Sequence, residues 1–531
     1  MKYSIQNCPI EWAFSSGKVY NNPFSDIELD VVFTDPDGVE MRVPTFWSGD
    51  QTWRVRFSAP KTGLYHYRTI CSDTSNSDLH GQEGKVEIAP YNGDNRLLKH
   101  GNLRVASDKR HLEHHDGTPF FWLADTWWMG LVKRLRYPDE FQMLTADRVQ
   151  KGFTVIQIVA GLYPDMDQFD ERGANEAGFP WEKDYSKINP SYFDMADIRI
   201  QWLIKSGLVP CIVSCWGYYI DFVGIDVLKR HWRNLLARYG AYPVVWCMAG
   251  EAIMPYYLAP GDKRAELITK ARSGWTEITK YLREIDPYHH PITIHPTDCG
   301  HNQVDDRSVI DIDMLQTGHG GWDSMPNTVR QVIDSLAIEP KMPVLVGEVS
   351  YETIGGGCLQ DVQRFAFWSC ILSGACGHTY GANGIWQVNR REKPFGPSPH
   401  GMSWGNIPWD EAYRLPGSAQ IGTGKALLMR YPWWQFEPHP EWVANHATKE
   451  NVRAPYCAGI PKAVRIIYMP NFMTVQVKGI ESDTKYRAFY YCPQSGNEIE
   501  IGTVNPDADG NWQSPRPPIF QDWLLVLEKA S

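Results

Sequence analysis

The sequence predicts an α/β fold, a (β/α)8 TIM barrel flanked by an N-terminal β-sandwich and a small C-terminal β-sandwich. Three observations predict it. The chain has 531 residues, which is too long for one ordinary core. Its two ends alternate polar and apolar residues at β-strand spacing. Its middle instead alternates short apolar strands with longer helical patterns. We therefore expect three domains, at residues 1–92, 93–430 and 431–531.

The N-terminal domain is predicted from short alternating strands separated by turns. The segment "DIELDVVFTDPDG" alternates and then turns at Pro-Asp-Gly, and "TWRVRFSAPKTGLYHYRTI" supplies two more strands around Pro60 and Gly63. This pattern is typical of a small sandwich. The C-terminal domain is predicted on the same grounds from "VRIIYMPNFMTVQV", "KYRAFYYCPQSGNEIEIG" and "PPIFQDWLLVLEKA".

The barrel is predicted from eight short apolar segments with helical patterns between them, such as residues 263–286. Eight βα units are the number in a (β/α)8 barrel. A doubly wound sheet competes, but it normally carries a glycine-rich turn after its first strand, and "LADTWWMG" is not one. The predicted strands are residues 119–125, 153–161, 208–216, 243–250, 291–296, 312–318, 343–348 and 374–381.

Composition narrows the partners. The net charge is −10 with acids and bases interspersed, which argues against nucleic acid because phosphate binding requires clustered Lys and Arg. No segment approaches the roughly 20 apolar residues that a membrane span needs. The first residues, "MKYSIQNCPIEWAF", lack an apolar signal-peptide core, so we expect a cytoplasmic protein, or a secreted one whose signal has been removed. Composition leaves the oligomeric state open.

Polar and aromatic side chains close the predicted strands. Active sites of such barrels form at the C-terminal ends of the strands, so these side chains are expected to meet at one mouth. Hydroxyl-binding and ring-stacking groups together indicate a carbohydrate site, although any one of them alone is more simply explained by a local hydrogen bond. The predicted substrate-binding residues are Asp125, Trp127, Gln157, Trp216, His295, Gln316, His319, His378 and Tyr380.

Two glutamates are the candidate catalytic residues. "VVWCMAGEA" and "MPVLVGEVSYE" each end a buried strand on Gly-Glu, at Glu251 and Glu348. Burying a carboxylate is unfavourable unless it is paired or useful, and strands four and seven face each other across a barrel mouth. Two facing carboxyls can cleave a glycoside, one as acid and one as nucleophile or base. Glu352 is a weaker rival for Glu348 and is expected to form a loop hydrogen bond.

Other chemistries have weaker signals. The chain has no His-Glu-x-x-His helix and no His-x-His strand that would bind a metal. It also has no Gly-x-Ser-x-Gly elbow of a serine hydrolase. Two carboxyls suffice for both halves of glycoside cleavage, so we expect neither a metal nor a cofactor.

The chain resembles the apiosidase-like catalytic domain of glycoside hydrolase family 140. "PFFWLADTWW", "GEVSYE" and "RLPGSAQIG" carry the resemblance within the barrel. The front region, with "FWSGDQTWRVRFSAPKTGLYHYRT", is similar to the small β-sandwich of unknown function (type 5060) that precedes such barrels. The tail, with "YYCPQSGNEIEIG", is similar to a small β domain labelled collagen-binding. The resemblance covers essentially the whole chain.

The resemblance implies an acid/base after strand four and a nucleophile after strand seven, which correspond to Glu251 and Glu348. The family has Asp at the first position, and the wider clan has Asn where Gly250 stands, so the sugar stays open. We predict a retaining, apiosidase-like and exo-acting glycoside hydrolase of an oligosaccharide or glycoside. The Trp- and Gly-rich segment 381–410 favours terminal action. Alternatives are an endo-acting glycanase, another furanosidase or pyranosidase of the clan, a non-catalytic glycan-binding protein, and a module that docks on matrix or protein.

Overall fold

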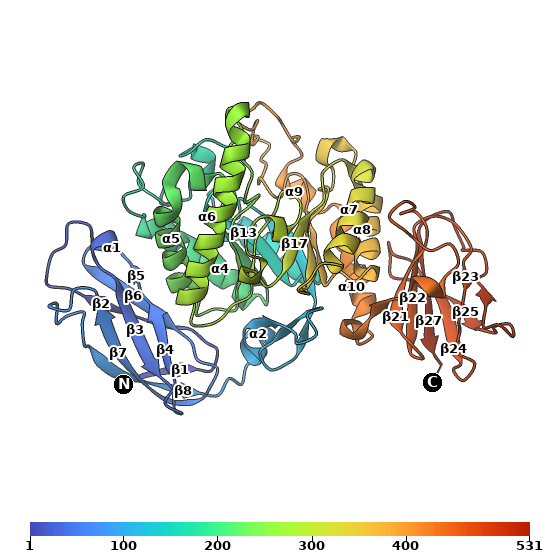
Figure 1. Ribbon diagram of the computed structural model, residues 1–531, viewed down its shortest axis with the longest axis horizontal. Coiled ribbons are helices and arrows are strands. Elements are labelled where there is room, and N and C mark those ends of the chain that lie inside the picture. The colour runs from blue at the N-terminus through green and yellow to red at the C-terminus, as the bar shows by residue number, and fades with distance from the viewer. Residues whose placement is uncertain (531) are drawn as a thin grey trace.

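The computed structural model describes residues 1–530 and has three parts in a row. Figure 1 shows a central barrel with a β domain on either side, the N-terminal one in blue and the C-terminal one in red. The arrangement confirms the predicted fold class. Among the described residues no helix is long and apolar enough to cross a membrane.

The N-terminal part consists of two packed β-sheets. A five-stranded sheet has the order β1-β8-β7-β3-β4, and a three-stranded sheet has the order β2-β6-β5. Phe33 and Phe57 stack face to face between the sheets at 3.8 Å, so alternate residues of both sheets form one core. The elements are β1 (Lys2–Ile5), β2 (Ile10–Ser15), α1 (Pro23–Asp26), β3 (Leu29–Thr34), β4 (Glu40–Pro44), β5 (Phe46–Trp47), β6 (Thr52–Phe57), β7 (Gly63–Cys71) and β8 (Glu83–Ala89).

The barrel sheet contains eight parallel strands in the order β16-β15-β14-β13-β12-β19-β18-β17. The Asp311 N–H closes the seam by donating to the carbonyl of Ile292 at 2.8 Å, beside the Thr293 hydroxyl on the carbonyl of Ile312 at 3.0 Å. Every strand residue is buried, as expected when helices cover the outer face. The strands are β12 (Trp122–Trp127), β13 (Val155–Leu162), β14 (Val209–Cys215), β15 (Val245–Cys247), β16 (Ile292–Thr293), β17 (Asp313–Gln316), β18 (Val344–Glu348) and β19 (Gly377–Tyr380).

Helices follow seven of the eight strands. After β16, two single 3-10 turns, η3 (Gly300–Asn302) and η4 (Arg307–Val309), replace the helix, because this connection is short and rich in Asp. Predicted strands 243–250 and 291–296 are longer than β15 and β16, because their last residues leave the sheet to build the barrel mouth. The α-helices are α3 (Asp139–Gln150), α4 (Pro190–Lys205), α5 (Tyr219–Tyr239), α6 (Arg264–Ile285), α7 (Met325–Leu336), α8 (Gln360–Leu372), α9 (Trp409–Ala412) and α10 (Pro416–Leu428).

The bottom of the barrel and the C-terminal part are also β-rich. A three-stranded sheet of β9 (Leu103–Val105), β10 (Leu112–His114) and β11 (Pro119–Phe120) follows α2 (Arg96–His100) and precedes the barrel. The C-terminal part has a six-stranded sheet, β20-β21-β22-β27-β24-β25, and a β23-β26 pair. Its strands are β20 (Glu437–Pro438), β21 (Tyr456–Ile460), β22 (Val464–Met469), β23 (Gln476–Val477), β24 (Tyr486–Tyr491), β25 (Glu498–Thr503), β26 (Trp512–Gln513) and β27 (Trp523–Lys529).

Buried ion pairs fix both β parts to the barrel. Arg56 on β6 pairs with Asp197 on α4, and Arg364 on α8 binds both oxygens of Asp522 at 2.8 and 2.9 Å. A bidentate guanidinium–carboxylate pair fixes orientation as well as distance. The barrel mouth is thus held on a scaffold of three joined parts.

Candidate active site

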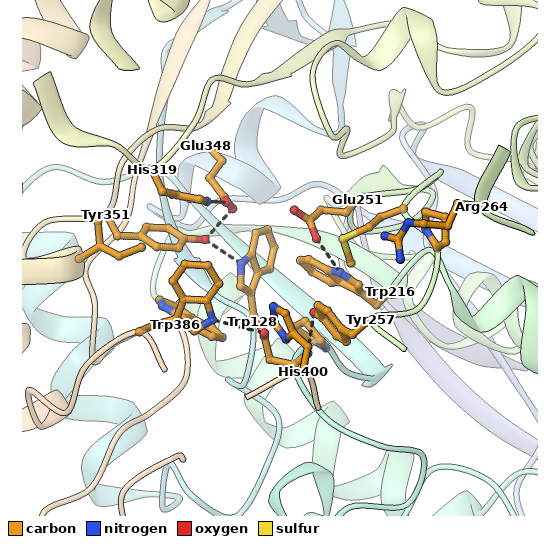
Figure 2. Close-up of a pocket in the computed structure, with 16 residues that line it drawn as sticks. Trp128, Trp216, Glu251, Tyr257, Arg264, His319, Glu348, Tyr351, Trp386 and His400 are labelled. Carbon is orange, nitrogen blue, oxygen red and sulfur yellow. Dashed lines mark hydrogen bonds and ion pairs between the residues drawn. The ribbon is translucent and has the colours of Figure 1, made fainter. Parts of the chain in front are cut away.

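A pocket opens at the C-terminal ends of the barrel strands, where the fold predicts a site. It is a cavity of about 310 Å³, and Figure 2 shows the aromatic and charged side chains around it. The lining residues are Trp128, Pro164, Asp165, Trp216, Glu251, Met254, Pro255, Tyr257, Arg264, His319, Glu348, Tyr351, Ile354, Trp386, His400 and Trp404.

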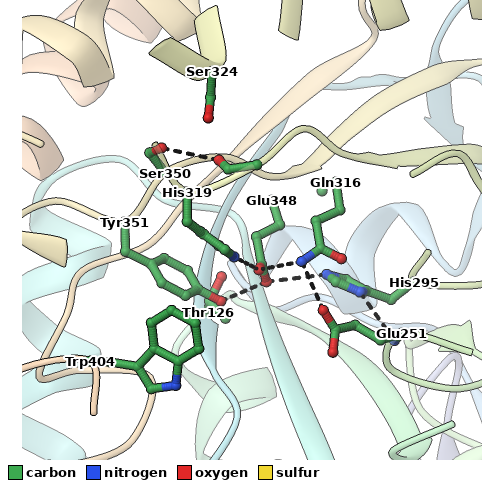
Figure 3. Close-up of polar contacts among 12 residues, drawn as sticks. Thr126, Glu251, His295, Gln316, His319, Ser324, Glu348, Ser350, Tyr351 and Trp404 are labelled. Carbon is green, nitrogen blue, oxygen red and sulfur yellow. Dashed lines mark hydrogen bonds and ion pairs between the residues drawn. The ribbon is translucent and has the colours of Figure 1, made fainter. Parts of the chain in front are cut away.

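Glu348 ends β18 and is 4% exposed. Tyr351 donates its hydroxyl to Oε2 at 2.6 Å and itself accepts from the indole of Trp128 at 2.9 Å. His319 Nε2 lies 2.9 Å from Oε1, and His295 Nε2 lies 3.2 Å from Oε2 (Figure 3). Burial acts to raise the pKa of Glu348, but the two histidines outweigh it and hold this pKa well below its usual range. Glu348 is therefore a carboxylate at neutral pH.

Glu251 follows β15 with a left-handed backbone, at φ +43°. A residue other than glycine adopts this conformation only when the surrounding structure imposes it. Its neighbour Gly250 lies against the Trp216 ring, where an added Cβ would come within 2.2 Å of a ring carbon. The close approach brings the Trp216 indole N–H to Oε2 of Glu251 at 3.1 Å. This explains why glycine, and not asparagine, precedes the acid.

The environment of Glu251 favours its protonated form. Burial raises its pKa, and the nearby charge of Glu348 raises it further. Among the described residues no Lys or Arg pairs with Glu251. The pKa values of the two acids are therefore shifted in opposite directions, so Glu251 keeps its proton to a higher pH than Glu348, which is the division of labour that acid–base catalysis requires.

One amide connects the two acids. Gln316 Nε2 donates to Oε1 of Glu251 at 3.0 Å and to Oε1 of Glu348 at 3.1 Å (Figure 3). The two hydrogens of an amide diverge by the trigonal angle, so the two acceptor oxygens lie about 5 Å apart and at most about 6 Å. This gap is wide enough for one anomeric carbon between the carboxyls.

The structure brings six predicted residues together at this mouth: Glu251, Glu348, Trp216, His295, Gln316 and His319. Trp216, His319 and the two glutamates line the pocket. His295 is fully buried behind Glu348, and its ring packs edge-on against Trp128 at 5.2 Å. It acts on the acids and does not face the cavity.

Asp125 and Trp127 do not reach the pocket, which corrects their prediction as substrate-binding residues. Asp125 is fully buried, and its Oδ2 accepts from Arg148 at 2.6 Å and from the Trp127 indole at 2.7 Å. Trp127 packs edge-on against Phe141 on the helix side. Successive strand residues point to opposite faces, so its neighbour Trp128 faces the mouth instead.

Gln157, His378 and Tyr380 are also fully buried and away from the cavity, so their prediction as substrate-binding residues is likewise corrected. Gln157 donates across the barrel interior to the carbonyl of Gly347 at 2.8 Å. Burial lowers the pKa of His378 to about 3, so this imidazole is neutral and packs edge-on against Phe367.

Tyr380 donates to Oε2 of Glu352 at 2.5 Å. This hydrogen bond holds Glu352, the rival candidate for Glu348, away from the cavity. Glu352 also accepts from the N–H of Gly417 at 3.1 Å and is 1% exposed. Its contacts are those of a structural carboxylate below the site, as expected from the sequence.

Several pocket residues were not predicted from the sequence. Tyr351 lies in the quoted "GEVSYE", three residues after Glu348, so its position just past the end of a strand could have suggested it. Asp165 follows β13 in "LYPDMD", and Trp386 and Trp404 come from the loop after β19. Loop residues have no periodicity that shows which way they point, so only their composition could have suggested them.

Comparisons with known proteins place two segments of the chain in known families. The family model described as "Apiosidase-like, catalytic domain" matches residues 106–435, and a domain of unknown function (DUF5060) matches residues 7–72. A search of curated proteins finds no match.

Solved structures share the architecture. The chain is similar to a candidate glycoside hydrolase from Bacteroides vulgatus ATCC 8482 (17% identity, all of both chains, TM-score 0.71). It is also similar to a family 5 glycoside hydrolase from the same organism (22% identity, 81% of this chain and 93% of that one, TM-score 0.68). A third structure, named only as a glycoside hydrolase, is 23% identical over 81% of this chain and 97% of its own (TM-score 0.67). At these identities the likeness supports a shared fold. Given the match of its barrel to the family model, the chain belongs to the apiosidase-like catalytic domain family and is a glycoside hydrolase.

Proposed function

We propose that the protein hydrolyses a glycosidic bond with retention of configuration, with Glu348 as nucleophile and Glu251 as general acid/base. The observation that carries this proposal is the single amide of Gln316 that reaches both carboxylates. Retaining glycosidases have carboxyls about 5–5.5 Å apart, whereas inverting ones leave about 6.5–9.5 Å for a water molecule. The limit of about 6 Å set by Gln316 favours retention.

The protonation states assign the roles. Glu348, ionised, attacks the anomeric carbon, while Glu251 gives its proton to the glycosidic oxygen as the carbon–oxygen bond breaks. The ionised Glu251 then takes a proton from water, which attacks the anomeric carbon and releases Glu348. Glu348 loses its charge when it bonds to the sugar in the first step, and this loss lowers the pKa of Glu251. Glu251 can therefore act first as the acid and then as the base.

Exo action is the second part of the proposal. The loop after β19 contributes Trp386, His400 and Trp404 to the pocket wall, and the His400 ring stacks on Tyr257 at 5.0 Å with 16° between the planes. A walled pocket accepts a chain end more readily than the middle of a polymer. The family match makes a terminal apiose-like sugar the first candidate.

The experiment is a panel of aryl furanosides, aryl pyranosides and plant or bacterial oligosaccharides, followed by NMR of the first-formed product. We expect one substrate class to be cleaved with retention and the E348Q variant to be slower by on the order of 10⁴-fold or more. The E352Q variant, four residues on, is the matched control for a lost carboxylate and keeps most of its activity per folded molecule. Inversion of the product, or near-normal turnover by E348Q, contradicts the proposal.

A further inference from the structure

The pocket contains a third acid, Asp165, for which the two-glutamate mechanism has no role. It lies in the loop after β13, is 9% exposed, and has a left-handed backbone at φ +57°. Burial raises the pKa of Asp165, although hydrogen bonds from Ser398, Trp404 and Tyr257 act in the other direction. A carboxylate in such a place is unfavourable unless something compensates it.

The contacts hold this carboxylate in one orientation. Ser398 donates its hydroxyl to Oδ1, and the Trp404 indole donates to the same oxygen at 3.3 Å. The Asp165 N–H donates to the Tyr257 hydroxyl at 3.1 Å. Ser398 and Trp404 belong to the loop after β19, and the Tyr257 hydroxyl, which follows β15, also interacts with the carboxylate. Asp165 therefore joins the two loops that wall the cavity.

The second oxygen is left open. Within residues 1–530, the Tyr257 hydroxyl lies beside the carboxylate, but no side chain or backbone N–H reaches Oδ2 of Asp165 in hydrogen-bond geometry, and no Lys or Arg forms an ion pair with this acid. Asp125 shows the contrast, because Arg148 and two further donors occupy both of its oxygens. A carboxylate with one oxygen anchored and the other free in a sugar-sized cavity is an acceptor for a hydroxyl donor.

We propose that Asp165 is a specificity-determining residue whose Oδ2 accepts a hydroxyl hydrogen bond from the sugar held between Glu251 and Glu348. The inference rests on the proposed function for the position of that sugar. The role of Asp165 predicts which class of sugar the site accepts. The site selects a neutral, hydroxylated sugar unit and disfavours one that carries a carboxylate toward Asp165, because two facing carboxylates repel each other in a poorly hydrated pocket.

Arrangement and charge agree with this selection. Asp165, Glu251 and Glu348 all line the cavity, whereas the basic lining residues are Arg264, His319 and His400, of which His319 is already paired with Glu348. The charge of Asp165 also acts on Glu251 in the direction that keeps Glu251 protonated. The acid thus contributes to the proton on the catalytic group as well as to the recognition of the sugar.

The test is the binding of free monosaccharides to the full-length chain. Binding is measured as the quenching of the fluorescence of the pocket tryptophans. The probes are D-apiose, D-xylose, L-arabinose, D-glucose and D-galactose, with D-glucuronate and D-galacturonate as acidic partners of the last two. We expect the wild type to prefer neutral sugars. The D165N variant places an amide donor where Oδ2 stood, so its affinity for neutral sugars falls about 10- to 100-fold and the neutral-to-acidic ratio falls at least tenfold.

The S398A variant is the matched control, since it removes a donor to Oδ1 and keeps the charge of Asp165. It should retain the preference for neutral sugars even if all affinities fall together. Thermal melting confirms that each variant is folded, and D165S replaces D165N if the latter does not fold. An unchanged ratio in D165N, or failure of every neutral sugar to bind the wild type, overturns the proposal. Hydrolysis is not needed for this readout, so a failure of the catalytic roles remains distinguishable.

Discussion

Two pairs of buried or half-buried acids in the same barrel have opposite environments. Asp125 and Glu352 are each saturated by fixed donors, among them the Arg148 guanidinium at 2.6 Å from Asp125. Glu251 and Glu348 face a cavity and, among the described residues, have only neutral donors and imidazoles as partners. Asp125 is paired with a permanent cation, whereas Glu352 has only neutral donors, yet neither lines the cavity. Burial alone therefore does not distinguish a structural acid from a catalytic one, whereas access to the cavity does.

After loss of the nucleophile, the largest effect should come from removing the proton donor. In E251Q we expect kcat/KM to fall by about 10²- to 10⁴-fold on substrates with a poor leaving group. The loss should be much smaller on a dinitrophenyl glycoside, whose leaving group needs no proton. Added azide, which attacks without base assistance, should restore turnover and yield a glycosyl azide. Equal losses on both substrates would remove Glu251 from the acid role.

Substitutions in the structural pair, Asp125 and Glu352, should lower stability and not activity. D125N leaves the Arg148 guanidinium buried without its main partner, which we expect to lower the free energy of unfolding by roughly 3–5 kcal/mol. The matched control is D147N, because Asp147 pairs with the same Arg148 from a more exposed position, and its loss should be below about 1 kcal/mol. Chemical denaturation measures both. A stable but inactive D125N would mean that the two pairs are not distinct in role.

The pH dependence of catalysis tests the partners of Glu348. His319 helps to hold the pKa of Glu348 down, so H319Q should raise this pKa and move the acidic limb of kcat/KM upward by roughly one to two pH units. H400Q is the control, because His400 lines the same pocket without contacting Glu348. An acidic limb that stays in place in H319Q would show that another group sets it.

The smallest effect is on stability and concerns Glu251. Its pKa is raised by folding, so its contribution is most favourable below the pKa of the unfolded chain, about 4.3, and is lost as pH rises through the folded value. Above the pKa of the unfolded chain, the wild type is therefore destabilised by the cost of ionising Glu251 in the folded protein, and E251Q does not have this cost. We expect it to melt at a higher temperature than the wild type at pH 7, by a few degrees, with the difference vanishing near pH 4. A constant difference across this range would argue against a raised pKa.

How far the sequence predicts this molecule depends on the kind of signal. Strand-end positions and helical spacing are local, so the eight barrel strands and the two Gly-Glu ends could be read from them. The choice between Trp127 and Trp128 could not, because a one-residue shift along a strand reverses the face. The pairing of Asp125 with Arg148 on α3 was equally hidden, since it depends on how a helix packs against its strand.

The loops show the same limit more strongly. Asp165 follows β13, and its donors Ser398 and Trp404 lie more than two hundred residues away in the loop after β19. Such contacts depend on the closed barrel, which brings β13 and β19 to either side of β12. The Trp and Gly content of the loop after β19 was enough to predict that this loop walls the cleft. Nothing in the sequence indicated that Asp165 would be the acid that binds this loop.

The measurement that tests the central claim most directly is covalent trapping of the nucleophile. The full-length enzyme would be incubated with a dinitrophenyl 2-deoxy-2-fluoro glycoside of its best sugar, digested, and mapped by mass spectrometry. The account predicts one fluoroglycosyl group per chain on the peptide that contains Glu348, and no label in E348Q. A label on Glu251, on Glu352 or on Asp165 would contradict it.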